Sequence, residues 1–349
     1  MLALTLALTG DFMVQRVTMS DVAREAGVSL MTVSRVVNNK GEISPETRER
    51  IQEVIEKLGY RPSGIARSLA AGQTYTIGLV VPDIANPYFS GIAHGVTSKA
   101  NAEGFGVLLC DCEEDTSLEL TMLDVLEEKR VDGVIVAAPR TPSDALLPVL
   151  ERHQNVVVVN RLFEKTKNPP ASGYVLNNDK LGAYTSLQHL IERGHQKIGF
   201  LAGPSSSYGS KQRMIGYYAA LEENNLEIIP EIIQHCIPTV QGGKKAAVQL
   251  LDEYPEITAL FCFNDLVAIG ALQCCQQIGR KVPADLAVIG YDDIPMASWV
   301  TPTLTTCKVN FEGMGSTATH LLINQINDCA NDCNNIVLEP QLIIRDSAP

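Results

Sequence analysis

The segment from Thr18 to Arg35 places the strongest constraint on the fold, because it predicts two short helices joined by a tight turn. The Thr18 hydroxyl is placed to cap the first helix, Gly27 to end it, and Ser29 to cap the second. Six apolar residues recur at helical spacing and are expected to be buried: Val22, Ala23, Ala26, Val33, Val36 and Val37. The pattern is typical of a helix-turn-helix, and a solvated helical hairpin is the alternative.

The exposed face of the second helix carries four side chains: Leu30, Met31, Ser34 and Arg35. In a helix-turn-helix, the N-terminal part of the second helix meets base edges in the major groove, where an Arg can bind guanine through two hydrogen bonds. We therefore expect Arg35 to read a base. Leu30 and Met31 are unusually apolar for such positions; they contact thymine methyl groups, or Met31 simply fills a gap.

A third helix and a new strand come next in the chain. Ser44 and Pro45 form an N-cap and first-turn pair, and Gly59 ends the helix that they open. The inward positions of this helix are Ile51, Val54, Ile55 and Leu58. Beyond Arg61, the apolar run from residue 76 to residue 81 predicts the first strand of a separate domain.

From Val17 to Arg345 the chain resembles the bacterial transcription regulators of the lactose and galactose repressor (LacI/GalR) family. The resemblance rests on motifs that occur in the family's order: DVAREAGVS, TVSRVVNN, SPETRERI, LGYRPSGIARSLA, GHQKIGFLAGP, FCFNDLVAIGAL, VPADLAVIGYDD and TPTLTT. It implies an α/β fold with an N-terminal three-helix headpiece and a hinge helix. A two-lobed effector domain with parallel sheets follows, similar to type I periplasmic binding proteins.

The expected domain boundaries follow from this resemblance and from the length of 349 residues, which is too great for one ordinary core beside a headpiece. We expect a disordered start-site extension at 1–13, the headpiece at 14–61, and the hinge helix and linker at 62–74. The N-terminal lobe is expected at 75–177 plus 308–327, and the C-terminal lobe at 178–307 plus 335–349.

The first twelve residues, MLALTLALTGDF, are apolar enough to need a decision about export. No Lys or Arg precedes the apolar run, which is too short to span a bilayer, and no clear cleavage pattern follows. We therefore interpret them as an extension, with Met13 as a second start and a signal peptide as the alternative.

Strand and helix signals alternate through the rest of the chain, which favours parallel sheets covered by helices. Strands are expected at 77–81, 106–110, 133–137, 156–160, 198–202, 259–262 and 287–290. Helices are expected at 117–129, 182–193, 213–224, 243–253 and 265–277. The resemblance implies three crossings between lobes, near Asn177, Cys307 and 321–335. It also implies an effector in the cleft beyond the carboxyl ends of the strands.

The residues expected to bind the effector lie at these strand ends: Asn86, Tyr88, Phe89, Asn160, Arg213, Asn264 and Asp292. Arg213 matches the family's cleft arginine, and Asp292 matches the carboxylate that accepts paired hydroxyls or a ring nitrogen. The aromatic pair could stack on a sugar ring or a base. The alternatives are that Phe89 only packs a helix on the sheet, that Arg213 makes a structural ion pair, and that Asn264 and Asp265 only cap a helix. Asp293 is expected to be structural.

Departures from the family pattern guide the choice of effector. Alanines stand at 137 and 138, where some members carry Asn or Asp, and Asn160 stands where many have Asp. Ser207 and Gly209 replace the arginine and threonine of the purine-responsive member. We therefore expect a sugar or sugar acid, with a nucleobase or another metabolite as the alternative.

In the family the hinge forms a helix only on operator DNA, and two copies wedge a leucine into the minor groove. Here that leucine is Leu69, and Gly64 would keep the free helix weak; a flexible linker is the alternative. The full set of expected DNA contacts is Thr18, Ser20, Ser29, Leu30, Met31, Thr32, Ser34, Arg35, Asn38, Thr47, Ala66, Arg67 and Leu69.

The resemblance thus implies a homodimeric repressor that binds a pseudo-palindromic operator in the cytoplasm, with the effector changing DNA affinity by about 1 to 3 kcal/mol. Residues 14–71 carry a net charge of +2, whereas residues 72–349 carry −13, so we expect DNA contact only at the headpiece and hinge. The chain ends without a leucine-heptad tail, which favours a dimer over a tetramer.

Two other protein classes fit the sequence less well. A dinucleotide-dependent enzyme would need a glycine-rich phosphate loop, and no strand is followed by GxGxxG or by P-loop spacing. A secreted sugar-binding protein would lack the headpiece. The nine cysteines show neither CxxC pairs nor metal spacing, so we expect no metal site. The resemblance implies that the protein is not an enzyme, needs no cofactor and does not associate with a membrane.

Overall fold

The computed structural model describes residues 17–38, 41–61, 72–163, 173–329 and 334–349. The chain divides into two compact units, with the boundary between Thr74 and Tyr75. The expected extension at 1–13 and the hinge residues Ala66, Arg67 and Leu69 lie outside the described residues.

The described residues of the first unit form the helices α1 (Met19–Ala26), α2 (Leu30–Val37) and α3 (Pro45–Leu58). Thr18 and Asp21 form a reciprocal capping box at α1, in which Thr18 N donates to Asp21 Oδ2 at 2.9 Å. Gly27 and Gly59 end α1 and α3 with φ of 66° and 63°, a left-handed backbone that glycine adopts without strain. The capping residues predicted from the sequence are therefore confirmed.

The core of this unit comes from one face of each helix. Its buried residues are Val22, Ala23, Ala26, Val33, Val36, Ile51 and Tyr60. The partly buried residues Val37, Val54, Ile55 and Leu58 pack against them. All the predicted inward positions belong to this core, although four of them are only half-buried: Val37, Val54, Ile55 and Leu58. Tyr60 was not predicted.

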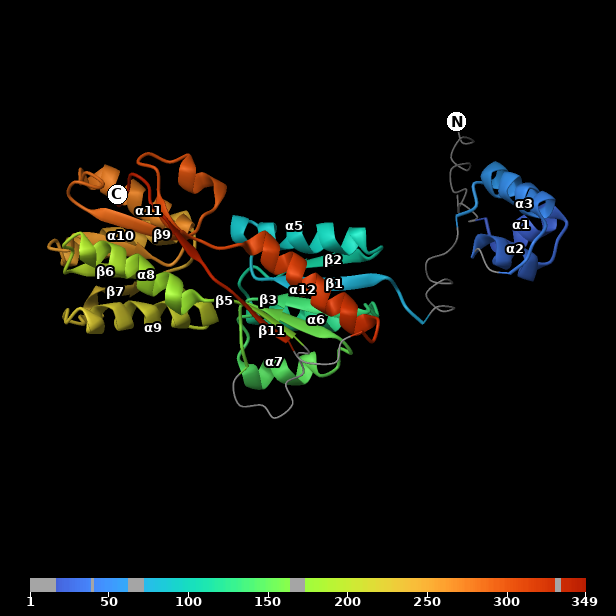
Figure 1. Cartoon of the computed structure of the whole chain (residues 1–349), viewed down its shortest axis with the longest axis horizontal. Coiled ribbons are helices and arrows are strands. Elements are labelled where there is room, and N and C mark those ends of the chain that lie inside the picture. Colours follow the sequence, from blue (N-terminus) through green and yellow to red (C-terminus); the bar gives the residue numbers. More distant parts are fainter. Residues whose placement is uncertain (1–16, 39–40, 62–71, 164–172, 330–333) are drawn as a thin grey trace, which may run out of the picture. The chain divides into compact units, whose positions relative to one another are not determined.

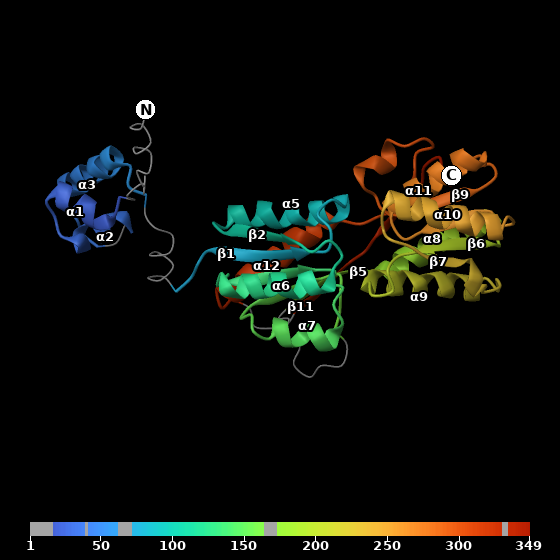
Figure 2. The same cartoon turned by 180° about the vertical axis from the view of Figure 1, so that it is seen from behind.

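The first sheet of the second unit is parallel throughout, with the strand order β11-β5-β4-β3-β1-β2. Its strands are β1 (Thr76–Val81), β2 (Gly106–Asp111), β3 (Gly133–Ala137), β4 (Val156–Val159), β5 (Gly173–Asn177) and β11 (Asn334–Leu338). Helices α5 (Pro87–Ala102) and α12 (Phe311–Ile326) cover one face of the sheet, and α6 (Thr116–Glu128) and α7 (Ser143–Leu150) cover the other (Figures 1 and 2).

Alternation along the strands explains this layering. In β4, Val157 and Val159 face the core under α5 and α12, whereas Val156 and Val158 face the core under α6 and α7. Because both faces are covered, the central strands are continuous apolar runs. This is why the sequence predicted them well.

The second sheet has the strand order β12-β10-β9-β8-β6-β7. Its strands are β6 (Ile198–Ala202), β7 (Ile233–His235), β8 (Ala259–Cys262), β9 (Ala287–Asp292), β10 (Thr305–Lys308) and β12 (Gln341–Ile343). All pairs are parallel except β10 with β12. Helices α8 (Asp179–Glu192) and α9 (Tyr208–Glu223) cover one face, and α10 (Val240–Glu253) and α11 (Asp265–Ile278) cover the other.

The chain crosses between the two lobes after β5, after β10 and between β11 and β12. The first two crossings lie near Asn177 and Cys307 as predicted, but the third lies at residues 339–340, and the prediction of 321–335 was wrong. The assignment of 335–349 to the C-terminal lobe is also corrected, because β11 pairs with β5 and extends the first sheet. An edge strand is covered less completely, so β11 lacks the apolar run that marks the central strands.

Among the described residues, no helix combines the length and the apolar character that a membrane span requires. In the same part of the chain, no group of three or more His, Cys, Asp or Glu side chains is arranged to hold a metal ion.

Candidate functional site

The solvent face of α2 presents the side chains that the sequence predicted for base contact. Leu30 is 51% exposed and Met31 is 65% exposed, so Met31 does not fill a gap in the core. Arg35 is also exposed, and its stem lies beside Gly41, where an added Cβ would be 3.5 Å from Arg35 Cδ. The three side chains are therefore free to meet a ligand, with the Arg35 charge at the far end of the helix.

Three other predicted DNA contacts are helix caps: Thr18 at the start of α1, Ser29 at the start of α2 and Asn38 at its end. Ser29 Oγ accepts a hydrogen bond from Thr32 N at 3.1 Å, and Ser44 Oγ accepts one from Thr47 N at 3.3 Å. The exposed backbone N–H groups at such helix starts favour anions. Thr18, Ser20 and Asn38 are exposed, and Thr32, Ser34 and Thr47 are half-buried.

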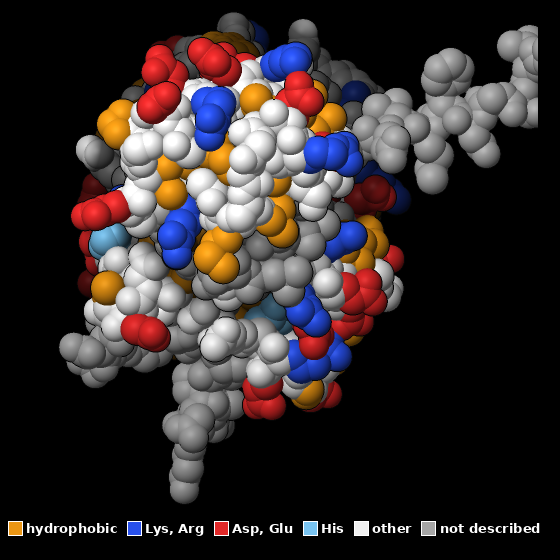
Figure 3. Space-filling model, turned by 90° about the vertical axis from the view of Figure 1, so that its right-hand side faces the viewer, with side chains coloured by type: hydrophobic (Ala, Val, Ile, Leu, Met, Phe, Trp, Pro, Cys, Tyr) orange, Lys and Arg blue, Asp and Glu red, His pale blue; other side chains and the backbone are white. Residues whose placement is uncertain are grey.

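Charge on the molecular surface is mixed in sign. On the face drawn in Figure 3, Lys and Arg side chains are interspersed with Asp and Glu, and hydrophobic side chains lie between them. Among the described side chains drawn there, no continuous positive patch is seen.

A cavity lies in the second unit where the carboxyl ends of the two sheets meet. All seven predicted effector residues line it. The complete lining is Asn86, Tyr88, Phe89, Ala138, Arg140, Asn160, Ser207, Gly209, Arg213, Pro238, Phe263, Asn264 and Asp292. The structure therefore brings together side chains that are up to 206 positions apart in the sequence, from Asn86 to Asp292.

Sequence reasoning missed two side chains that shape the cavity, Arg140 and Phe263. Both follow a strand directly or closely, Arg140 after β3 and Phe263 after β8. Position beyond the carboxyl end of a strand was the signal that could have found them.

The start of α5 forms one wall. Asn86 caps the helix, with its Oδ1 accepting a hydrogen bond from Tyr88 N at 3.1 Å. The Tyr88 and Phe89 rings meet edge to face, with centroids 5.0 Å apart, and both are buried. Phe89 belongs to the core cluster and also lines the cavity. The ring thus packs the helix on the sheet and is also placed where a ligand could contact it, so the two predictions for Phe89 are compatible.

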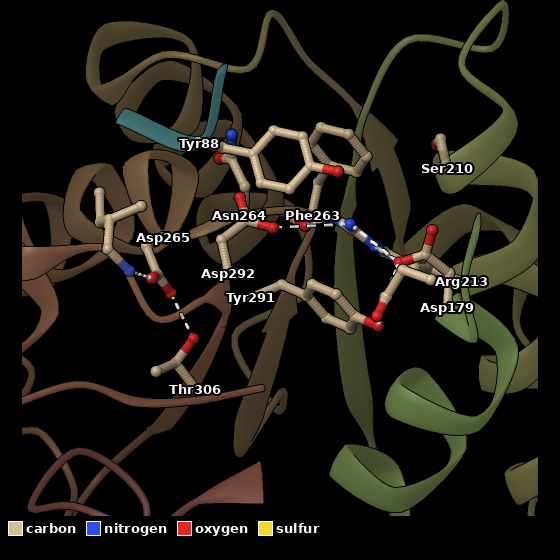
Figure 4. A network of polar contacts seen from close by, with 12 residues as sticks. Tyr88, Asp179, Ser210, Arg213, Phe263, Asn264, Asp265, Tyr291, Asp292 and Thr306 are labelled. Carbon is tan, nitrogen blue, oxygen red and sulfur yellow. Dashed lines mark hydrogen bonds and ion pairs between the residues drawn. The ribbon is translucent and has the colours of Figure 1, made fainter. Parts of the chain in front are cut away.

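Arg213 on α9 dominates the opposite wall (Figure 4). Its Nε and Nη2 donate to Asp179 Oδ1 at 3.1 and 3.0 Å, and its Nη1 donates to the Phe263 carbonyl. The guanidinium carbon lies 3.6 Å from the centroid of the Tyr291 ring. Burial lowers the pKa of Arg213, but Asp179 and Asp292 raise it by more, so the guanidinium stays charged.

Asp292 ends β9 beside this arginine, with its Oδ1 3.6 Å from Arg213 Nη2. Its backbone has φ of 108°, and Asn160 and Ala138 also have positive φ, at 52° and 44°. Such backbone in non-glycine residues is strained and is common at functional sites. Among the described atoms, Asp292 Oδ1 and Asn160 Oδ1 are buried without a hydrogen-bond donor, so both can accept one from a ligand.

The neighbouring polar residues have structural contacts. Asn264 caps α11, accepting a hydrogen bond from Val267 N at 2.9 Å, and it also lines the cavity. Asp265 accepts instead from Ile294 N at 2.8 Å and from the Thr306 hydroxyl at 2.5 Å, away from the cavity (Figure 4). Asp293 pairs with Arg345 at 2.7 Å and is structural, as expected.

The cavity volume is about 30 Å³, far below the roughly 300 to 1,000 Å³ of typical ligand pockets. The cavity in this conformation is therefore too small for a ligand of ordinary size, which could enter only after the residues that line it move apart.

Comparisons with known proteins agree with this architecture. The family described as "Periplasmic binding proteins and sugar binding domain of LacI family" matches residues 74–345, and "Bacterial regulatory proteins, lacI family" matches residues 18–63. The HTH-type transcriptional repressor PurR of Aliivibrio salmonicida is 34% identical over 330 residues, covering 95% of this chain and 98% of that protein. The ribose operon repressor of Halalkalibacterium halodurans is 34% identical over 331 residues, covering 95% and 96%.

The solved structure of the lac repressor dimer bound to operator and the anti-inducer ONPF is 29% identical, with a TM-score of 0.85 over 96% of this chain and 99% of that one. Both units of the chain thus have counterparts in one regulator. The relatives are transcriptional repressors and not enzymes. The chain belongs to the LacI family of bacterial transcriptional regulators and is a ligand-responsive, DNA-binding repressor.

Proposed function

We propose that this repressor controls a catabolic operon and responds to a polyhydroxylated small molecule, a sugar or a sugar acid. The observation that carries the proposal is the cavity between the lobes, where polar side chains from both lobes converge beside buried aromatic rings. The acceptors Asp292 Oδ1 and Asn160 Oδ1 suit ligand hydroxyl groups, which can donate to them. The Tyr88 and Phe89 rings suit the C–H faces of a sugar ring.

A nucleobase is the second candidate, favoured by the likeness to the PurR repressor. Overall identity does not choose between the two, because the ribose operon repressor is equally similar at 34%. The cavity wall at Ser207 and Gly209 is more informative. Ser207 Oγ already accepts from Ser210 N at 3.3 Å, and Gly209 has no side chain, so neither extends a new polar group towards a base. We therefore favour the polyhydroxylated ligand.

On the DNA side, we propose that two copies of the chain read a pseudo-palindromic operator in the cytoplasm. Arg35, Leu30 and Met31 would lie at base edges, and the helix caps around them at phosphates. The lac repressor structure is a dimer, which supports the same assembly here. The edge strand β2 also exposes Leu108 and Leu109, an apolar surface that a second copy could cover.

Two linked measurements test the proposal. A thermal-shift screen of the full chain against sugars, sugar acids and nucleobases identifies the effector class, because a ligand that binds only the folded state raises its stability. A gel shift then uses an operator obtained by binding-site selection, with and without the compound that stabilised the protein in the screen. The affinity for the operator should change by about 5-fold to 150-fold. Stabilisation by nucleobases alone would support the second candidate, and unchanged operator affinity would contradict ligand control.

A further inference from the structure

We infer that the effector is electrically neutral and that Asp179 is the residue that excludes anionic ligands such as sugar acids. The inference rests on the proposed function and narrows its ligand class. It follows from the charged side chains at the cavity in the described part of the chain.

Both guanidinium groups that reach the cavity are already paired with carboxylates of the chain. Arg140 Nε and Nη2 donate to the two oxygens of Glu114 at 2.7 and 2.9 Å, and its Nη1 donates to Ala138 O at 2.8 Å. Arg213 is held by Asp179 and by the Phe263 carbonyl. Neither arginine therefore offers an uncompensated positive charge to a ligand.

A third carboxyl group, Asp292, leaves the site without a net positive charge. It lies 3.6 Å from the same guanidinium that Asp179 holds, so Asp179 neutralises Arg213 when Asp292 is protonated, and two carboxylates outnumber it when Asp292 is ionised. Burial raises the pKa of Asp292 well above its usual range, Arg213 lowers it, and Asp265 and Asp179 raise it again. Three further charged side chains nearby are buried and do not line the cavity: Arg161, Glu119 and Asp265.

We assign this preference to Asp179 rather than to Asp292, because Asp292 lines the cavity itself, whereas Asp179 is not among the lining residues and holds Arg213. Asp179 is buried at the start of α8, and its Oδ1 also accepts from Asn177 Nδ2 at 2.9 Å. An anionic group at Arg213 would have to share the guanidinium with Asp179 and Asp292, so its charge would lie beside two buried carboxyl groups that already use that positive charge. A neutral hydroxyl avoids this cost.

The test compares neutral sugars with their acids on the full chain by calorimetry, in pairs: D-glucose with D-glucuronate, D-galactose with D-galacturonate and D-ribose with D-ribonate. We expect the acid of the preferred sugar to bind the unmodified protein on the order of 10-fold to 100-fold more weakly than the sugar. In Asp179→Asn, which keeps an acceptor for Arg213, the acid should gain at least about 10-fold relative to the sugar.

The matched control is Asp252→Asn, which removes the same charge from an exposed position on α10. It should leave the ratio of the affinities for the acid and the sugar unchanged. An acid that binds the unmodified protein as tightly as its sugar overturns the inference, and this comparison does not depend on the variant folding. An unchanged ratio in folded Asp179→Asn overturns the role of Asp179. Binding by nucleobases alone contradicts the proposed effector class itself, which separates the two failures.

Discussion

At the scale of single residues, Arg35 is the exposed side chain of α2 best suited to choose a base. Replacing Arg35 with Ala should cost about 1 to 3 kcal/mol at one base position and relax the preference there, because a bidentate contact to guanine is lost. Binding-site selection with the variant measures both effects. An unchanged motif would show that Arg35 does not read a base.

Arg24→Ala is the matched control for that experiment. Arg24 is an exposed arginine on α1 whose ion pair with Asp21 lies within one helical turn. Surface ion pairs of this kind contribute little to stability, so the Arg24→Ala variant should stay folded. Because Arg35 is intact in it, binding-site selection should return the same DNA motif as for the unmodified protein.

Asp265 makes a second prediction, on pH. Burial raises the pKa of Asp265 to about 7 from 3.8, although the hydrogen bonds from Thr306 and Ile294 lower it. The pKa of Asp265 is higher in the folded protein than in the unfolded chain. The protonated carboxyl group therefore makes its whole contribution to the free energy of unfolding below about pH 4, and this contribution is lost as the pH rises through about 7. The amide in Asp265→Asn does not titrate. The melting temperature of this variant should therefore rise relative to that of the unmodified protein as the pH is raised from about 5 to about 8.

A melting curve at each pH for both proteins checks this. The exposed Asp252→Asn variant, measured in parallel, should follow the unmodified protein across the range. A constant difference between Asp265→Asn and the unmodified protein would mean that Asp265 does not titrate there.

At the scale of elements, helices α5 and α12 approach each other through glycines. A Cβ on Gly95 would overlap the Glu312 carbonyl, and one on Gly315 would overlap the Ile92 carbonyl. Gly95→Ala should therefore destabilise the protein by about 1 to 3 kcal/mol through overpacking, as measured by thermal or urea unfolding.

Gly106→Ala is the control for that change. A Cβ on Gly106 would meet only Tyr75 O, at 3.9 Å, which is an ordinary contact. The control should stay close to the stability of the unmodified protein, and an equal loss in both variants would contradict the packing argument.

The hinge supplies another prediction, although Leu69 lies outside the described residues. If two copies of this side chain wedge into the operator, Leu69→Ala should weaken specific binding far more than nonspecific binding, because only the kinked operator uses the wedge. Gel shifts on operator and on scrambled DNA measure the two. Equal losses on both DNAs would rule out the wedge.

The strands predicted best were those whose burial on both faces gives a continuous run of apolar residues in the sequence. Strands β3 and β4 are apolar throughout because both faces are covered, and they were placed within a residue of their ends. Strand β11 was missed because it lies at an edge and alternates, with Val337 exposed. Strand β5 begins with Gly173 and ends with Asn177, residue types that are uncommon in strands.

The cavity shows the same division between local and distant information. Its seven predicted residues stand in recognisable motifs, so they could be named from the sequence. The partners Glu114 for Arg140 and Asp179 for Arg213 lie 26 and 34 positions away, and no local pattern joins them. The charge balance of the site therefore became visible only in three dimensions.

At the scale of the whole molecule, the small cavity makes a kinetic prediction. If the residues that line the cavity must move apart before the effector enters, the observed binding rate should level off at high ligand concentration, because opening becomes rate-limiting. Trp299 is the one tryptophan in the sequence and is 73% exposed, so its fluorescence is the intrinsic signal to follow in stopped flow. A rate that stays linear up to saturation would contradict rate-limiting opening, and Trp299→Phe should abolish the signal.

The interleaved path of the chain also has a consequence for biosynthesis. The three helices of the first unit are contiguous and complete by residue 61, so they can fold soon after they leave the ribosome. The first sheet, in contrast, needs β11 and α12, which are made almost last. The DNA-binding unit of each nascent chain should therefore be folded well before the lobes that regulate it are synthesised. A chain truncated by premature termination would keep the DNA-binding unit but lack the domain that regulates it.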